Sequence, residues 1–499
     1  MSSPPLVLLI NPRMCTPRRV RLPLSLLTLA AKLQGRYRYQ VVDGNVADVN
    51  ASIGATLGDS ALAMAAVSVM PGPQVPPAIE VSRTIRAVRP DVPVVWGGYF
   101  PTLYPDAAIN APYVDAVVRG PGEDTLLELL EHWPSAAHIN GVTWRDGNRI
   151  VHNAERALAS PTALPPLPYD ALPDLEPYLR PTFLGRRTAV HQAAIGCRYR
   201  CRFCGVVSMF NGQTRLQHAD RVIRDLAHLQ HHCGADSVQF YDHNFFDRQQ
   251  TSEETLEALA QVRLPWWCYA RADALAAFTP RMWSLARESR MRMAYIGAET
   301  GSNEALRRMQ KGGRVETTLE VAARLRENGI TPEFSFVLGG PDDPEADTEA
   351  TFEFIRRLKR AHPACEVVLY FYSPTPQRDP RSAARDGAAS LPRLERYGPA
   401  GPALPTTPEE WSEPRWVRWV CHQDAPWLTP RLRQRVRDFA RVLECRFPTV
   451  QDHHTPGWQK SVLREMARWR WATRTYARPL ELALARKGIA LRQPQVESL

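Results

Sequence analysis

Two long stretches of this 499-residue chain, residues 6–131 and 189–375, alternate short apolar runs with amphipathic segments. Apolar runs of about four to eight residues predict buried strands, and apolar side chains with a period near 3.6 predict helices that cover them. Strands that alternate with helices along a chain form parallel sheets. The sequence therefore predicts an α/β protein in which each stretch builds its own parallel sheet.

The first stretch predicts a doubly wound, Rossmann-like domain. Its expected strands are 6–10, 38–42, 61–69, 92–96 and 114–118, and its expected helices are 22–33, 77–88 and 123–132. Sheets of this kind bind ligands in the loops beyond the carboxyl ends of their strands. The loops with a suitable composition are 43–45, 68–72, 97–102 and 120–125. Glycines in these loops allow the backbone to approach a bulky ligand closely.

The second stretch repeats strand and helix with the period of a β/α barrel. Its expected strands are 189–195, 237–241, 266–270, 293–297, 333–338 and 366–371. A complete barrel of this type has eight strands, so a count of six predicts an open, partial barrel. The active site of such a barrel lies at the carboxyl ends of the strands. In this chain each of those ends is followed by a polar or glycine-rich turn.

The first of these strands leads into Cys197, Cys201 and Cys204, which have the spacing C-x3-C-x2-C. Thiolates are the ligands that iron–sulfur clusters take from proteins. Three cysteines on a cluster of four irons leave one iron open to a small molecule. The alternatives are a zinc site, with His191 or His218 as the fourth ligand, and three unrelated buried thiols. The spacing differs from that of the common structural zinc sites.

With an apolar strand before it and Phe203 ahead of its third cysteine, the motif resembles the signature of radical S-adenosylmethionine (SAM) enzymes. The resemblance implies that Cys197, Cys201 and Cys204 hold a [4Fe-4S] cluster. It also implies that the open iron chelates the methionine moiety of SAM. The reduced cluster of such enzymes cleaves SAM to a 5′-deoxyadenosyl radical.

Motifs at later strand ends resemble the same family in the expected order. The stretch around Glu299 resembles G-x-E-[ST]-G-S, which implies a contact with the ribose or amino group of SAM. Gly339 and Gly340 match a G-x-P turn beside the adenine. Asp242 lies in a turn like F-x-D-D-x-F, where a helix cap is an equal interpretation. Arg271 offers a guanidinium fork that suits the methionine carboxylate, unless it is an ordinary surface arginine.

The loops of the first stretch resemble the cobalamin-binding domain of the B12-dependent radical SAM class, so that the resemblance covers about residues 5–375. It implies cobalamin contacts from Ser68, Gly97, Gly98, Gly120 and Glu123. The D-x-H-x-x-G motif, whose histidine ligates cobalt in some B12 proteins, is absent, because the equivalent loop reads Asp-Gly-Asn-Val at 43–46. We therefore expect an open or water-bound lower face of cobalt. The alternative is a degenerate domain that no longer binds cobalamin.

The sequence predicts four segments: a cobalamin-binding domain (1–132), a hairpin and Pro-rich linker (133–188), a radical SAM partial barrel (189–376) and a helical C-terminal domain (377–499). Residues 378–408 are expected to be loop. The last segment carries seven tryptophans: Trp411, Trp416, Trp419, Trp427, Trp458, Trp469 and Trp471. They predict either a small domain packed with tryptophan or an aromatic lid over a flat or hydrophobic substrate.

Composition and charge limit the class of protein. No run of about 18 apolar residues predicts a membrane span, and the apolar N-terminal run is interpreted as a strand rather than a signal peptide. Six cysteines outside the motif stand singly, which is typical of a reducing cytosol. The net charge of +10 is compatible with nucleic acid, an acidic substrate or an anionic membrane surface, and equally with an arginine-rich solvated surface.

The resemblance implies an enzyme that uses a [4Fe-4S] cluster, SAM and cobalamin, and the cysteine usage predicts a cytoplasmic location. The leading hypothesis is methylation of an unactivated carbon of a small molecule, with electrons from an external flavodoxin- or ferredoxin-type donor. The second is ring closure without methyl transfer, as in anaerobic tetrapyrrole cyclases. A more distant one is an RNA methylthiotransferase, but those enzymes carry extra N-terminal cysteines, and this N-terminal domain has only Cys15. Nucleic acid is therefore not an expected partner.

Overall fold

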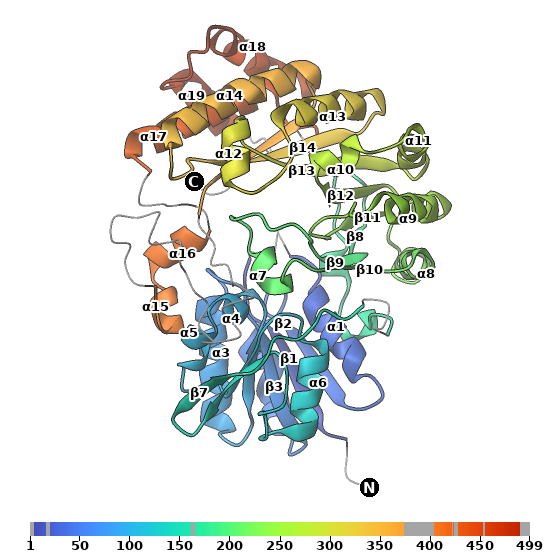
Figure 1. Ribbon diagram of the computed structural model, residues 1–499, viewed down its shortest axis with the longest axis vertical. Coiled ribbons are helices and arrows are strands. Elements are labelled where there is room, and N and C mark those ends of the chain that lie inside the picture. Colours follow the sequence, from blue (N-terminus) through green and yellow to red (C-terminus); the bar gives the residue numbers. More distant parts are fainter. Residues whose placement is uncertain are drawn as a thin grey trace.

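The computed structural model describes residues 4–15, 20–160, 165–373, 404–421, 423, 428–452 and 455–489. Figure 1 shows a lower α/β layer built from the N-terminal part of the chain and an upper α/β layer built from its middle part. The last helices cap the upper layer at the end farthest from the N-terminus. In the described part of the chain, no helix is long and apolar enough to cross a membrane.

The lower layer is a seven-stranded sheet with the order β2-β1-β3-β4-β5-β6-β7. The first five strands in this order are parallel to one another. β6 is antiparallel to β5, and β7 is antiparallel to β6. The strands are β1 (Leu6–Asn11), β2 (Arg38–Asp43), β3 (Leu62–Ser68), β4 (Val94–Gly97), β5 (Ala116–Val118), β6 (Val142–Asp146) and β7 (Arg149–His152). The five strands expected from the apolar runs are confirmed.

Helices cover both faces of this sheet because its strands are apolar on both faces. Along β1, Val7 and Leu9 belong to one core cluster, and Leu8 and Ile10 belong to the other. The first cluster includes α1 and α6, and the second includes α3 and α4. The helices are α1 (Leu24–Leu33), α2 (Val49–Leu57), α3 (Val75–Val88), α4 (Tyr99–Leu103), α5 (Pro105–Ile109) and α6 (Glu123–His132). The lower layer is doubly wound, as expected.

The segment expected to connect the two domains is partly built into the lower sheet. Its hairpin forms β6 and β7, and β6 pairs antiparallel with β5. Two short 3-10 helices follow, at Tyr169–Ala171 and Glu176–Tyr178. Tyr169 and Tyr178 are buried in the core. The segment predicted as a Pro-rich linker is therefore packed in this part, because apolar side chains among its prolines contact the core.

The upper layer is an open sheet of six parallel strands, in the order β15-β14-β13-β12-β11-β8. The strands are β8 (Thr188–His191), β11 (Ser237–Phe240), β12 (Trp266–Ala270), β13 (Met291–Glu299), β14 (Thr331–Leu338) and β15 (Glu366–Phe371). Its helices are α8 (Ala219–His231), α9 (Gln249–Val262), α10 (Ala272–Ala276), α11 (Pro280–Glu288), α12 (Asn303–Arg308), α13 (Val315–Glu327) and α14 (Pro344–Ala361). The predicted partial barrel is confirmed.

One expected strand of the barrel is broken in two. The strand predicted at 189–195 stops at the end of β8, at His191. A separate strand, β9 (Ala194–Gly196), follows and pairs antiparallel with β10 (Thr214–Leu216). The cysteine loop and α7 (Val206–Phe210) lie between β9 and β10. A Cβ on Gly196, whose φ is +81°, would lie 2.2 Å from the backbone oxygen of Gln213. Only glycine therefore allows this tight hairpin directly before the first cysteine.

The C-terminal part does not form the single helical domain expected for 377–499. The helices α15 (Pro408–Trp411) and α16 (Pro414–Val420) pack on the lower layer, whereas α17 (Pro430–Arg446), α18 (Gly457–Thr473) and α19 (Leu480–Gly488) pack beside α14 (Figure 1). Trp411 lies 4.1 Å from the ring of Tyr104 in the lower core. Phe439 stacks on Phe352 of α14 at 3.8 Å. The C-terminal helices therefore contact both layers. Most of the loop expected at 378–408 lies outside the described residues.

Candidate active site

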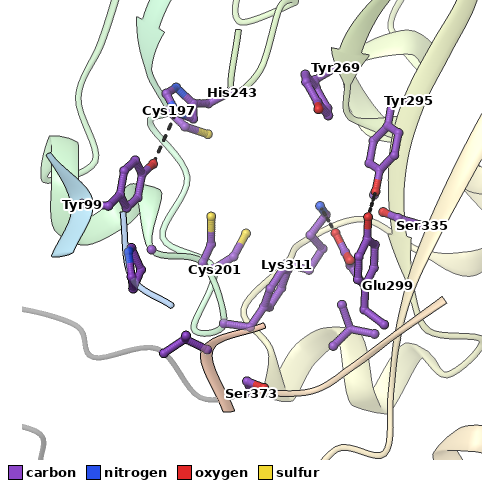
Figure 2. Close-up of a pocket in the computed structure, with 18 of the residues that line it drawn as sticks. Tyr99, Cys197, Cys201, His243, Tyr269, Tyr295, Glu299, Lys311, Ser335 and Ser373 are labelled. Carbon is purple, nitrogen blue, oxygen red and sulfur yellow. Dashed lines mark hydrogen bonds and ion pairs between the residues drawn. The ribbon is translucent and has the colours of Figure 1, made fainter. Parts of the chain in front are cut away.

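A cavity of about 450 Å³, the central cavity, opens at the carboxyl ends of the barrel strands and faces the lower layer. Cys197, Cys201, Cys204, Arg271 and Glu299 all line it. These five residues come from three separate parts of the sequence, and the structure brings them together as expected. Figure 2 shows Cys197 and Cys201 on one side of the cavity and Glu299 on the other.

The three cysteines point into this cavity from one loop. A turn closes the loop, in which the backbone N–H of Cys204 donates to the carbonyl of Cys201 at 3.2 Å. Burial raises the pKa of Cys197, and it raises the pKa of Cys204 to about 12. Buried thiols become thiolates when a metal coordinates them. The cavity therefore offers a set of soft ligands that fits an iron–sulfur cluster.

The zinc alternative finds no support in the arrangement of side chains. His191 and His218 do not line the central cavity. Within the described residues, no three His, Cys, Asp or Glu side chains converge closely enough to hold one metal ion.

Arg271 connects the cysteine loop to the next strand ends. Its guanidinium contacts the sulfur of Cys201 at 3.8 Å and lies 3.6 Å above the ring of Tyr199. It also donates twice to Asp273, at 2.9 and 2.8 Å, and to the carbonyl of Lys311 at 2.5 Å. The predicted contact with the methionine carboxylate stays a prediction, since every edge of this fork already has a partner.

Glu299 forms a buried ion pair that the sequence did not reveal. The Lys311 ammonium lies 2.5 Å from Oε1 of Glu299. Burial lowers the pKa of Lys311 most, but the charge and hydrogen bond of Glu299, together with the charge of Cys201, outweigh it, so the pKa is raised and the amine stays charged. A Cβ on Gly297 would lie 2.2 Å from the same oxygen, so glycine leaves room for the pair. Lys311 lies in the sequence Met-Gln-Lys-Gly at 309–312, shortly after Glu299. This short motif was the sequence signal that could have predicted the ion pair.

Three of the expected SAM contacts do not line the central cavity. Asp242 is fully buried, and its Oδ2 accepts a hydrogen bond from the backbone of Ala193 at 3.2 Å, directly before β9. Burial raises the pKa of Asp242 to about 7. Gly339 packs against Leu428, and Gly340 lies near Asp347. Asp242 therefore supports the strand that carries the cysteine loop rather than facing the cavity.

A second cavity of about 480 Å³, the lower cavity, lies at the carboxyl edge of the lower sheet. All five residues expected to contact cobalamin line it: Ser68, Gly97, Gly98, Gly120 and Glu123. Gly98 has a φ of +96°, and a Cβ there would lie 2.9 Å from the carbonyl oxygen of Val69. Glycine-lined walls leave room for a large planar group close to the backbone. The lower cavity therefore fits cobalamin.

The loop that replaces the cobalt-ligating histidine motif is held by hydrogen bonds. Asn45 lines the lower cavity, and its Oδ1 accepts from the backbone N–H of Met14 at 2.9 Å. The carboxylate of Asp43 accepts from Asn11 at 3.0 Å and from Tyr178 at 2.9 Å. The open or water-bound lower face of cobalt stays a prediction.

Tyr99 and His243 line both cavities. The Tyr99 hydroxyl lies 3.4 Å from Nε2 of His243, as the dashed line in Figure 2 shows. Burial lowers the pKa of His243 to about 4, so the ring is neutral near pH 7. Burial also raises the pKa of Tyr99. Sequence reasoning missed this pair, because its members follow motifs of two different domains.

Comparison with known proteins identifies both layers. The model of the B12 binding domain matches residues 19–130, and that of the radical SAM superfamily matches residues 193–355. The chain belongs to the cobalamin-dependent radical SAM enzymes. Its cofactors are therefore a [4Fe-4S] cluster, SAM and cobalamin.

The chain is similar to a solved structure and to several other sequences. The structure of the radical SAM methyltransferase TsrM from Kitasatospora setae, with cobalamin and a [4Fe-4S] cluster bound, superposes with a TM-score of 0.60 at 21% identity, over 74% of each chain. An uncharacterised methyltransferase of Pyrococcus horikoshii is 25% identical over 67% of this chain and 73% of its own length. An anaerobic magnesium-protoporphyrin IX monomethyl ester cyclase of Synechocystis is 23% identical, over 58% of this chain and about half, 56%, of the cyclase.

Proposed function

We propose that this cobalamin-dependent radical SAM enzyme methylates an unactivated carbon of a small molecule. The observation that supports this most strongly is the meeting of the two cavities at Tyr99 and His243. A substrate carbon held there faces the central cavity on one side and the lower cavity on the other. When bound, the cluster with SAM supplies the 5′-deoxyadenosyl radical, and cobalamin supplies the methyl group.

The side chains of the central cavity bind and orient the reactants. We infer that Cys197, Cys201 and Cys204 hold the cluster, and that Glu299 and Lys311 orient SAM. Arg271 ties the cysteine loop to the Lys311 loop, so that these two sets of contacts keep a fixed separation. A mostly apolar lining excludes water, which protects a carbon radical from side reactions.

The glycine-lined loops of the lower cavity are the inferred cobalamin contacts, with Ser68 and Glu123 at their ends. The electrons for the cluster are proposed to come from an external donor of the flavodoxin or ferredoxin type.

Ring closure without methyl transfer is the second candidate, and the similarity to the Synechocystis cyclase favours it. RNA methylthiolation is more distant, because it needs cysteines for a second cluster. Cys15 is the single cysteine before Cys197, and it lines the lower cavity instead.

Methyl transfer and cyclisation can be distinguished without the natural substrate, because only methyl transfer forms S-adenosylhomocysteine from SAM and cobalamin. The enzyme, loaded with cluster and reduced cobalamin, is mixed once with SAM that carries a deuterated methyl group. A methyltransferase moves this group to cobalamin, so we expect about one S-adenosylhomocysteine per bound cobalamin. A Ser68→Trp variant that lacks cobalamin should yield none. If cobalamin-loaded wild-type enzyme forms no S-adenosylhomocysteine, methyl transfer is rejected and cyclisation becomes the better proposal.

A further inference from the structure

One wall of the central cavity is built from hydroxyl-bearing side chains on adjacent strands. Tyr269 on β12, Tyr295 on β13, Ser335 on β14 and Tyr370 on β15 form this tyrosine wall. Figure 2 shows Tyr269 and Tyr295 across the cavity from Cys197 and Cys201. Alternate residues of a strand point to the same face. The wall is therefore part of the barrel interior, on rigid elements.

The aromatic rings of the wall are fixed by their neighbours. The rings of Tyr269 and Tyr295 lie 5.0 Å apart at 65°, and Trp267 lies 4.6 Å behind Tyr269 at 70°. The hydroxyls of Tyr295 and Tyr370 lie 3.1 Å apart. Edge-to-face rings of this kind hold one another in place. The wall is consequently preformed for a ligand with a flat apolar surface.

The charged side chains of the central cavity already have partners. Arg271, Glu299 and Lys311 are the charged residues in its described lining. Arg271 is engaged by Asp273, and Lys311 is paired with Glu299. A phosphate or carboxylate placed against the tyrosine wall would be buried without a counter-charge, which is costly. The lining thus selects against an anionic substrate.

The side of the cavity toward cobalamin is formed by the ring of His243. The same side chain lies at the junction of the two cavities, next to Tyr99. A substrate between the tyrosine wall and His243 therefore meets aromatic rings on both sides.

We propose that the substrate is an uncharged, planar aromatic molecule that packs between the tyrosine wall and the ring of His243. This inference rests on the proposed function, because it places the substrate where both cofactors reach it. The inferred cluster ligands, the inferred SAM contacts Glu299 and Lys311, and the inferred cobalamin contacts do not include the wall, so its aromatic surface is left for the substrate.

Three matched probes test the chemical class: 2-naphthol, its saturated analogue decahydro-2-naphthol, and 2-naphthyl phosphate. Equilibrium dialysis with the full chain, loaded with cluster, cobalamin and SAM but not reduced, measures binding without turnover. We expect 2-naphthol to bind about tenfold more tightly than either analogue. Decahydro-2-naphthol loses the aromatic contact, and 2-naphthyl phosphate brings an unpaired charge.

Variants locate the binding to the wall. Tyr295→Leu should weaken 2-naphthol about tenfold, whereas Tyr295→Phe, which keeps the ring, should stay within about threefold. Tyr37→Leu, outside both cavities, is the control, and iron, cobalamin and SAM binding should be unchanged in all three variants. The proposal is overturned if the phosphate or the saturated analogue binds as tightly as 2-naphthol. Equal binding to Tyr295→Leu, or no binding of 2-naphthol, overturns it too.

This test separates the substrate class from the reaction. If 2-naphthol binds as expected but wild-type enzyme forms no S-adenosylhomocysteine from labelled SAM, methyl transfer fails and the substrate class stands. If S-adenosylhomocysteine forms but the probes show no aromatic preference, the reaction stands and the substrate class fails.

Discussion

The hydroxyl of Tyr99, at the start of α4, lies 3.4 Å from Nε2 of His243, in the loop after β11. The first residue belongs to the cobalamin-binding layer and the second to the radical SAM layer. Together they form the boundary between two cavities of similar size. The boundary is thin, so the position of two side chains decides what can pass between the cofactors.

Tyr99→Ala should merge the two cavities. Without the ring, a substrate at the junction of the two cavities is held less firmly, so 5′-deoxyadenosine released without product should rise severalfold. Tyr99→Phe keeps the ring and should behave like wild type. The ratio of 5′-deoxyadenosine to S-adenosylhomocysteine measures the effect. An unchanged ratio in Tyr99→Ala would show that the boundary lies elsewhere.

Glu299→Gln removes the carboxylate partner of Lys311. A hydrogen bond to a charged group contributes roughly 1.5–3 kcal/mol, so SAM affinity should fall about tenfold or more. Equilibrium dialysis of SAM with cluster-loaded protein measures this change. Glu316→Gln, at an exposed position on α13, is the matched control. Loss of iron from Glu299→Gln, or unchanged SAM affinity, would contradict the inferred role.

Ser68→Trp and Ser60→Trp test the lower cavity from the two ends of one strand. Ser68 ends β3 and lines the cavity, whereas Ser60 is exposed just before the strand begins. The indole at position 68 fills space meant for cobalamin. We expect Ser68→Trp to lose cobalamin but keep its iron, and Ser60→Trp to keep both. Cobalamin retained by Ser68→Trp would move its site elsewhere.

Asp242→Asn should change how stability depends on pH. Burial raises the pKa of Asp242 from 3.8 to about 7, so the native state holds its proton above pH 4 while the unfolded state releases it. Native stability therefore falls as pH rises from about 4 to 7, by roughly 4 kcal/mol at most. The neutral amide removes this cost, so the advantage of Asp242→Asn should grow over that range and level off above it.

Thermal unfolding of cluster-free protein between pH 5 and 8 measures the difference between Asp242→Asn and wild type. The lowered pKa of His243 acts in the opposite direction below about pH 6.5, but it is common to both proteins and cancels in the difference. Asp146→Asn, in the exposed turn of the hairpin, should show no such trend. A constant difference across the range would contradict the account of Asp242.

The sequence predicts the two sheets well because their strands are continuous apolar runs and their ligand loops are short. Ser68, Gly97, Gly98, Gly120 and Glu123 could be chosen because the strand ends of a parallel sheet share one edge. Such pattern reasoning works wherever a residue's task follows from its place in a single strand–loop unit.

The remaining features depend on contacts between distant segments. Asp242 follows a strand end, yet its carboxylate accepts a hydrogen bond from the backbone of Ala193. This contact exists because β9 is a separate strand that pairs with β10 and does not continue β8. The tyrosine wall and the Lys311–Glu299 pair join side chains from different strands or loops. Trp411, Trp416 and Trp471 pack in the cores, Trp419 lines the central cavity, and Trp458 and Trp469 are exposed. Trp427 lies outside the described residues.

The most direct test is the cofactor content of the full chain, purified without oxygen and reconstituted with iron, sulfide and cobalamin. We predict about four irons and one cobalamin per chain for wild type, and cobalamin without iron for Cys201→Ala. Cys421→Ala, which changes a cysteine outside the motif, should match wild type. A wild-type chain that binds zinc in place of iron, or four irons without cobalamin, would contradict the account.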